Sequence, residues 1–137
     1  MRIYFLFLLI IILVSCTNDA KVIKDVEYKI EEDYVEFYDN GIKKIEGVKL
    51  NGERHGVWNF YYKSGIKWSE GRYKEGKRDG YSIVYYENGK KKVQGDYKDH
   101  KRAGVWKIWN EDGTFKDQID FDKPLTRKDS ILIYTLP

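Results

Sequence analysis

The chain has 137 residues, with 25 basic and 22 acidic side chains, a net charge of +3 and one cysteine. This length suits one domain, the near-balanced charge argues against a nucleic-acid partner, and one cysteine excludes an internal disulfide. Aromatic residues make up 16% of the chain, so the packing of large rings has to supply the stability that disulfides do not.

The first 16 residues have the features of an export signal. Met1 and Arg2 form a short basic lead, and residues 3–14 are an apolar run shorter than the roughly 20 residues that span a bilayer. The run ends in Leu13-Val14-Ser15-Cys16, which resembles the lipobox of bacterial lipoprotein precursors. This resemblance implies cleavage before Cys16 and its acylation, which anchors the protein to the membrane. The alternative is a plain signal peptide, which would leave an odd thiol in an oxidising compartment.

The resemblance to lipoproteins also implies an address in the bacterial cell envelope. Thr17 follows the cysteine, whereas an aspartate there signals inner-membrane retention in enteric bacteria. The outer membrane is therefore favoured, although sorting rules differ between lineages. Residues 17–34 are expected to form a linker, with partial period-two alternation typical of a strand that caps a sheet edge.

Four turn glycines recur at an unbroken spacing of 24 residues: Gly41, Gly65, Gly89 and Gly113. Further glycines keep the same period, at Gly47, Gly71 and Gly95 and again at Gly56, Gly80 and Gly104. Such a period indicates a repeat architecture in which one supersecondary unit stacks on the next.

The repeats run over residues 35–56, 57–80, 81–104 and 105–125, each as strand, tight turn, strand and polar connector. Asn-Gly and Asp-Gly pairs between β-rich runs favour two-residue type I′ hairpins. We therefore predict an all-β fold over residues 35–121, an antiparallel meander of about eight strands in a single twisted sheet. Residues 122–137 follow as a tail or capping strand, because Pro124 interrupts pairing and residues 131–136 are apolar and β-prone.

The strand period assigns side chains to two faces of the sheet if each loop has two residues. One face is expected to be packed, with Tyr34, Tyr38, Ile45, Trp58, Phe60, Tyr62, Tyr73, Val84, Tyr86, Val93, Tyr97, Trp106, Ile108, Phe115, Ile119 and Phe121. A three-residue loop would swap these assignments. A lone sheet also needs a cover for its apolar face, from curvature, the flanking segments, a second copy or a partner.

The other face is expected to carry rings at the repeat period, namely Phe37, Tyr61, Tyr85 and Trp109. Their predicted cross-strand partners are Lys44, Trp68, Lys92 and Lys116. In a structural interpretation the lysines cover the rings through cation–π contacts. In a functional interpretation the face binds a protein, a glycan or a lipid headgroup. The candidate binding surface comprises Phe37, Tyr61, Trp68, Tyr85, Lys92, Trp109 and Lys116.

Two segments carry a further resemblance: Gly56-Val57-Trp58-Asn59-Phe60-Tyr61-Tyr62-Lys63-Ser64-Gly65 and Gly104-Val105-Trp106-Lys107-Ile108-Trp109. Residues 35–121 resemble MORN-type repeats (membrane occupation and recognition nexus), in particular the bacterial variant in proteins labelled as YwqK-type antitoxin components. The chain departs from the pattern at Lys49, where other repeats have an aromatic residue, and at Ile119, which replaces a glycine. The resemblance implies a non-enzymatic binding or scaffold module that contacts proteins or, in some proposals, phospholipid.

The sequence provides no catalytic or metal-binding motif. The two histidines, His55 and His100, occupy non-equivalent repeat positions in connectors, and no nucleophile-elbow motif accompanies the serines. No cluster of three or four metal ligands is apparent. We therefore expect no enzyme, no cofactor and no metal, and a module whose partner is a protein, with a glycan or lipid headgroup as the alternative.

Overall fold

The computed structural model describes residues 29–134 and 136–137. Within the described residues eight strands follow one another: β1 (Glu31–Phe37), β2 (Lys43–Leu50), β3 (Glu53–Tyr61), β4 (Lys67–Lys74), β5 (Lys77–Tyr85), β6 (Lys91–Lys98), β7 (Lys101–Trp109) and β8 (Phe115–Asp120). In this part of the chain the helix α2 (Arg127–Ile133) follows them. The predicted signal segment, Cys16 and residues 17–28 of the predicted linker lie outside the described residues.

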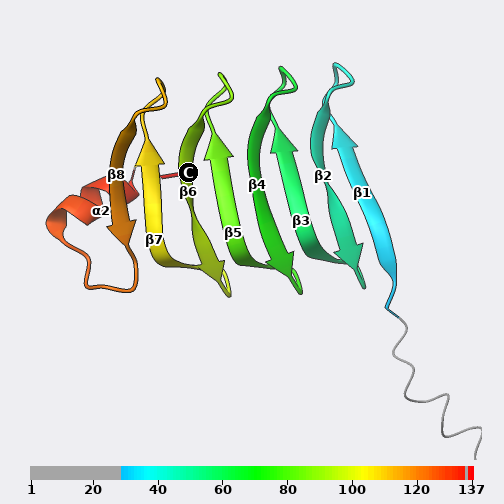
Figure 1. Ribbon diagram of the computed structural model, residues 1–137. Helices are drawn as coiled ribbons and strands as arrows, with labels where there is room; N and C mark the ends of the chain where they lie inside the picture. The colour runs from blue at the N-terminus through cyan, green and yellow to red at the C-terminus, as the bar shows by residue number, and fades with distance from the viewer. Residues whose placement is uncertain (1–28, 135) are drawn as a thin grey trace, which may run out of the picture.

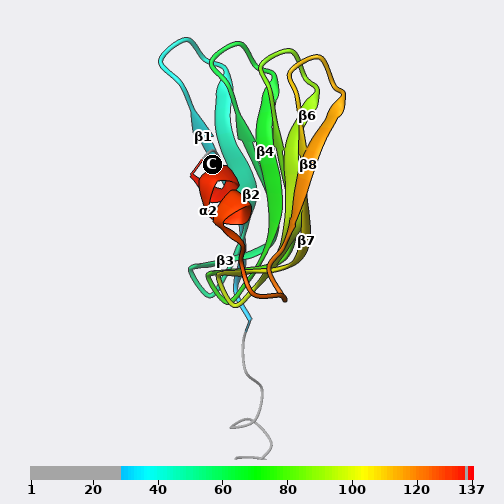
Figure 2. The same ribbon diagram turned by 90° about the vertical axis from the view of Figure 1, so that its left-hand side faces the viewer.

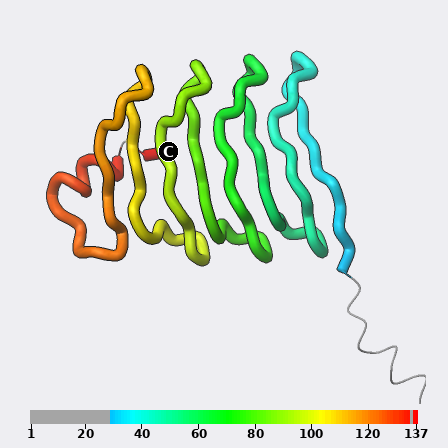
Figure 3. Tube along the Cα trace, viewed as in Figure 1, coloured from blue at the N-terminus to red at the C-terminus, as the bar shows by residue number. Residues whose placement is uncertain are grey.

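The strands form a single antiparallel sheet in the order β1 to β8, so each strand pairs with its neighbours in sequence. The predicted all-β meander of eight strands is confirmed. Figure 1 shows the sheet as a row of four hairpins, with the hairpin turns at one end and the connectors at the other. The Cα trace makes the repetition plain, because each hairpin copies the path of the one before it (Figure 3).

The hairpin turns differ from the predicted type I′. In the second repeat Tyr62 N donates to Ile66 O at 2.8 Å and Gly65 N donates to Tyr62 O at 2.9 Å. Gly65 has a φ of 87°, while Ser64 is not among the residues with positive φ. This is a three-residue loop in which one glycine takes the left-handed conformation, and the two-residue prediction is wrong.

A β-bulge beside each turn restores the predicted register. Phe60 pairs with Ser69 but Tyr61 pairs with Lys67, so Trp68 is an extra residue in β4. The loop has one residue more than predicted and the strand has one extra residue at the bulge. The two together keep each later side chain on the face that a two-residue loop without a bulge would give it. The predicted faces therefore hold along most of each strand and fail only beside the turn.

The predicted packed face, called here the inner face, contains the buried side chains: Trp58, Ser69, Tyr73, Val84, Val93, Tyr97, Trp106, Ile108 and Ile119. Phe115 was predicted to belong to it and does not. It pairs with Trp109 next to the bulge and is 56% exposed. The compensating bulge lies between Phe115 and the rest of β8, which is why the parity argument fails there.

Two tryptophans lie directly over glycines of the neighbouring strand. A Cβ atom added to Gly47 would lie 2.4 Å from the Trp58 ring, and one added to Gly95 would lie 2.3 Å from the Trp106 ring. Each indole N–H donates to the backbone carbonyl just beyond its glycine, Trp58 to Val48 at 3.0 Å and Trp106 to Asp96 at 3.1 Å. The periodic glycines thus provide flat backbone on which the indole rings pack.

Inner-face tyrosines link each repeat to the next. Tyr38 donates its hydroxyl to the carbonyl of Tyr61, Tyr62 to that of Tyr85, and Tyr86 to that of Trp109, at 2.7, 2.8 and 2.9 Å. Because each bond spans 23 residues, the repeats are joined by the same contact three times.

The tail does not form the predicted capping strand. Thr126 and Asp129 form a capping box, in which Thr126 N donates to Asp129 Oδ2 at 2.7 Å and Asp129 N donates to Thr126 Oγ1 at 3.2 Å. Helix α2 starts there and lies against the inner face of the sheet (Figure 2). Its apolar side chains and those after it, Leu132, Ile133 and Leu136, pack on the cluster formed by β5 to β8.

The cover is therefore partial. The buried cluster beneath the tail contains Val84, Val93, Tyr97, Trp106, Ile108 and Ile119, all from the C-terminal half of the sheet. Strands β1 and β2 contain no buried residue. Among the described residues, the tail covers the apolar face at the end formed by β5 to β8.

Candidate binding surface

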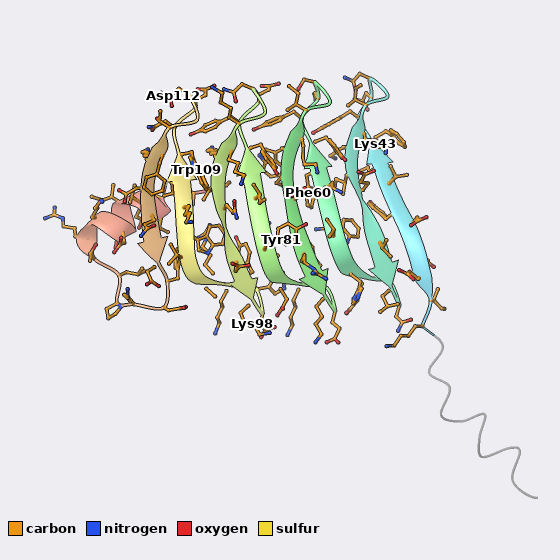
Figure 4. The ribbon with its side chains drawn as sticks, viewed as in Figure 1. Lys43, Phe60, Tyr81, Lys98, Trp109 and Asp112 are labelled. Carbon is orange, nitrogen blue, oxygen red and sulfur yellow. The ribbon has the colours of Figure 1, made fainter. Side chains whose placement is uncertain are left out.

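The outer face, opposite α2, carries a periodic set of side chains that we call the outer array. Its rings are Phe37, Tyr61, Tyr85 and Trp109, and their cross-strand partners are Lys43, Lys67, Lys91 and Phe115. Lys43 and Trp109 lie near the hairpin-turn end of the sheet, whereas Lys98 lies at the connector end (Figure 4). Four equivalent pairs thus follow one line across the sheet.

Carboxylates on the same face tie the rings to the lysines. The Tyr61 hydroxyl donates to Glu46 Oε1, and Lys43 forms an ion pair with Glu46 at 2.8 Å. One repeat later Tyr85 donates to Glu70 at 3.5 Å, and Lys67 pairs with Glu70 at 2.7 Å.

In the next repeat the equivalent positions hold a lysine, an amide and an indole in place of a lysine, a carboxylate and a phenol. Lys91 donates to Gln94 at 2.9 Å, and its ammonium lies 5.7 Å from the centre of the Trp109 ring. The array therefore passes from charged pairs near β2 to an amide and an indole near β7.

The contacts in the array change the acidity of its members. Burial, followed by the hydrogen bond to Glu46, raises the pKa of Tyr61 to about 12. Lys43 and then Tyr61, as hydrogen-bond donors, lower the pKa of the Glu46 carboxyl. Each effect keeps the ring neutral and the carboxylate charged, so the ring, the carboxylate and the lysine act as one unit.

Three residues of the predicted surface belong to the inner face instead. Trp68 packs edge-on against Phe60, with ring centres 6.1 Å apart. The Lys92 ammonium lies 5.6 Å from the centre of the Tyr86 ring, and Lys116 borders a depression with Leu136. Lys44, the predicted partner of Phe37, likewise lies over an inner-face ring, that of Tyr38, at 5.9 Å. The bulge beside each turn moves these side chains across the sheet.

The outer array continues into an apolar depression of about 420 Å³ at the β1 edge, bordered by Val35, Phe37, Val48 and Asn59 among others. Val35 and Phe37 are each about half exposed. Asn59 Oδ1 is buried and has no hydrogen-bond partner. The outer face thus combines exposed apolar area with a polar atom that lacks a partner.

A second periodic set, on the inner face, was missed in the sequence analysis. Arg54, Arg78 and Arg102 keep the 24-residue spacing, and the same comparison of repeats that found the glycines would have found them. Arg54 stacks on Trp58 and Arg102 stacks on Trp106, at 4.5 and 5.1 Å from the ring centres. None of the ion pairs among the described residues includes an arginine.

The two histidines have different surroundings in the structure. His100 accepts a hydrogen bond from the Arg78 backbone at 3.3 Å, and His55 Nδ1 is buried without a partner. Within residues 29–134 and 136–137 no hydrogen bond joins a serine to a histidine, and no group of three or more His, Cys, Asp or Glu side chains is placed to hold a metal ion. No helix in this part of the chain has the length and apolar character to cross a membrane.

Comparison with known families supports the repeat assignment. Residues 54–75 and 78–99 match the family model of the MORN repeat variant, and these ranges contain β4, β6 and most of β3 and β5. The match indicates no enzyme family. Neither a curated protein nor a solved structure matches the chain. The lipoprotein assignment and the YwqK-type antitoxin label stay predictions.

Proposed function

We propose that this chain, two of whose repeats match the MORN repeat variant, is a non-enzymatic module that binds a protein partner through the outer array. The observation that carries the proposal is the repetition of a ring, a lysine and a carboxylate or amide on the face that the chain's own tail does not cover. Tyrosine and tryptophan are frequent among residues that dominate binding energy at protein interfaces.

The dimensions of the outer face suit a protein. Eight strands spaced about 4.8 Å apart form a sheet roughly 34 Å wide, and strands of seven residues are roughly 23 Å long. The resulting face of about 800 Å² equals the area that one partner contributes to a standard protein interface.

The charge of the array favours a protein over an anionic headgroup. Lys43 and Lys67 are already paired with Glu46 and Glu70, so the face offers alternating charges instead of an excess of cations. A phospholipid headgroup or an anionic glycan would need unpaired positive charge, whereas alternating charges provide orientation and specificity between proteins.

We further propose that the module is anchored in the bacterial envelope, with the outer membrane favoured, through acylated Cys16. The lipobox Leu13-Val14-Ser15-Cys16 supports this proposal. A Cys16→Ser variant should lose incorporation of labelled fatty acid and leave the membrane fraction. Labelling equal to that of the unchanged chain would contradict the anchor.

Affinity capture from the native envelope tests the binding proposal. The bait is the full anchored chain, beside a Phe37→Ala/Tyr85→Ala/Trp109→Ala variant of the outer array and a matched Trp68→Ala variant of the inner face. A partner retained by the unchanged chain and by Trp68→Ala, but lost by the triple variant, supports the proposal once circular dichroism shows that all three chains fold. Equal capture by the triple variant contradicts it.

The same proteins test the alternative of glycan or headgroup binding by the outer array. A shift in tryptophan fluorescence on addition of envelope glycans or phospholipid vesicles, lost in the triple variant, would favour that alternative. An immunity-like role requires, in addition, that the captured partner be a toxin whose activity the chain suppresses.

A further inference from the structure

The third repeat departs from its neighbours at one inner-face position. Trp58 and Trp106 lie over Gly47 and Gly95, but the equivalent residue over Gly71 is Ser82, whose Oγ lies 3.5 Å from a Cβ atom placed on that glycine. The glycine is thus present at Gly71, but no indole ring covers it as Trp58 and Trp106 cover Gly47 and Gly95. A space is left in the middle of the inner face.

This space is a cavity of about 20 Å³, and the residues that line it are Phe60, Ser69, Glu70, Gly71, Arg72, Tyr73, Arg78, Ser82 and Tyr97. The Glu70 carboxylate itself is bound to Lys67 and Tyr85 in the outer array. Polar cavities of this size hold one water molecule or one oxygen atom of a ligand. Ser69 is 9% exposed, and neither its hydroxyl nor that of Ser82 takes part in a hydrogen bond with another described residue. Two hydroxyl groups are therefore available to a bound group.

Arg78 closes one side of the cavity. Its Nε donates to the Tyr73 hydroxyl at 3.4 Å and its Nη1 to the Tyr97 hydroxyl at 3.0 Å. Both tyrosines are 8% exposed. Because each phenol oxygen accepts from the guanidinium, its own proton is left to donate, and neither phenol donates to another described residue.

We propose that this cavity is a binding site for a carboxylate group, one oxygen of which enters between Tyr73 and Tyr97. The serine and tyrosine hydroxyls at the cavity can all act as donors, and Arg78 supplies a positive charge that forms no ion pair with a described carboxylate. A planar carboxylate matches the fork of a guanidinium.

The charge at the cavity favours a carboxylate over a phosphate. A carboxylate carries one negative charge, which the Arg78 guanidinium matches, whereas a phosphate monoester carries about two near neutral pH. The rest of the ligand has room in an open depression of about 440 Å³ that shares Arg78 and Tyr97 with the cavity. The site is on the inner face and shares one lining residue, Glu70, with the outer array.

The test uses the full chain in detergent micelles and follows the Arg78 Nε–H and the tyrosine ring signals by nuclear magnetic resonance. The probes are acetate, a peptide with a free C-terminal carboxylate, the same peptide amidated, and inorganic phosphate, with chloride to match ionic strength. We expect saturable shifts with acetate and the free peptide but none with the amidated peptide. If the free peptide binds no more tightly than acetate, the source is a small free acid; tighter binding identifies a polypeptide carboxylate.

Two variants locate the site. Ser82→Trp introduces the residue that the equivalent positions carry, over a glycine that is already flat, and should fill the cavity and weaken binding at least tenfold. Arg78→Lys keeps the charge but removes the planar fork, and should weaken binding similarly. Ser64→Trp, the same change in an exposed turn, should have no effect, and thermal melting shows that each variant folds.

Three results would overturn the proposal. One is the absence of saturable shifts with any carboxylate, which would mean that the cavity holds water only. Another is saturation by phosphate without saturation by acetate. The third is unchanged acetate binding in folded Ser82→Trp or Arg78→Lys.

Discussion

At the scale of single residues, the contact between indole and glycine makes the strongest demand on the sequence. An alanine at Gly95 would place its methyl group inside the Trp106 ring, which is 2% exposed and has no room to retreat. The ring or the strand would have to move, and overpacking of this kind costs about 1 to 3 kcal/mol.

We therefore predict that Gly95→Ala lowers the free energy of unfolding by about 1 to 3 kcal/mol, measured by urea denaturation. Gly71→Ala is the matched control, because its Cβ atom would lie 3.4 Å from the nearest atom, an ordinary contact. Equal losses for the two variants would show that the indole is not the cause.

Tyr61 gives a prediction on pH dependence. Its pKa in the folded chain is about 12, above the ordinary value of 10.0, so folding favours the neutral phenol. The stability that this shift contributes is complete below pH 10 and is lost as the pH rises through 12. Tyr61→Phe should therefore remove a late step from the phenolate absorbance titration and flatten the loss of stability in that range.

Glu46→Gln separates the causes of the Tyr61 shift. It keeps the size of the side chain and removes the charge, so the pKa of Tyr61 should fall while burial keeps it above the ordinary value. An unchanged titration in both variants would show that Tyr61 is not in contact with Glu46 in solution.

At the scale of the elements, the hairpin turn depends on one left-handed residue. Gly89 has a φ of 81° and no atom near its Cβ position, so a substitution there meets backbone strain without any clash. Gly89→Ala should cost about 1 to 2 kcal/mol in thermal or urea unfolding. Gly89→Asn should cost less, because asparagine tolerates this conformation better. Equal stability of all three chains would contradict the assigned turn.

The turn also shows what the sequence could and could not predict. The period of glycines and rings predicted the eight strands and most of the inner face, because strand parity is a local property. Loop length is decided by small differences between turn conformations that Asn-Gly and Asp-Gly both allow. The bulge at Trp68 and its equivalents has no sequence signal, so three residues of the candidate surface were placed on the wrong face.

The tail shows a different limit of prediction. Residues 131–136 have β-prone composition, yet Thr126 and Asp129 start a helix upstream of them. Once the helix begins, Leu132, Ile133 and Leu136 reach the same buried cluster, and tertiary packing outweighs local propensity. The capping box was present in the sequence as a signal that the β-prone composition obscured.

At the scale of the whole molecule, the repeats are unequally supported. The C-terminal half of the sheet contains a buried cluster covered by α2, whereas β1 and β2 have no buried residue. Because each repeat contacts only its neighbours, stability is approximately the sum of unit and interface contributions. The molecule should therefore open from the β1 end.

Amide hydrogen exchange checks this order. We expect the amides of β6 and β7 to be protected by the largest free energies and those of β1 and β2 to exchange through local opening. Ile133→Ala should reduce protection in β6 to β8 and leave β1 and β2 unchanged. Uniform protection along the sheet would mean that the repeats unfold as one cooperative unit.

Each hairpin has a three-residue loop and a one-residue bulge, which together keep the alternation of side chains between the two faces. A residue and its equivalent 24 positions later therefore lie on the same face of the sheet. A whole repeat added to or removed from the chain therefore leaves both faces intact and changes only the length of the sheet. Each unit contributes two strands, or about 10 Å. The outer-face rings are therefore spaced at regular intervals across the sheet. The number of repeats sets the distance between the first and last ring, and so the distance between the two points on a partner that these rings can contact.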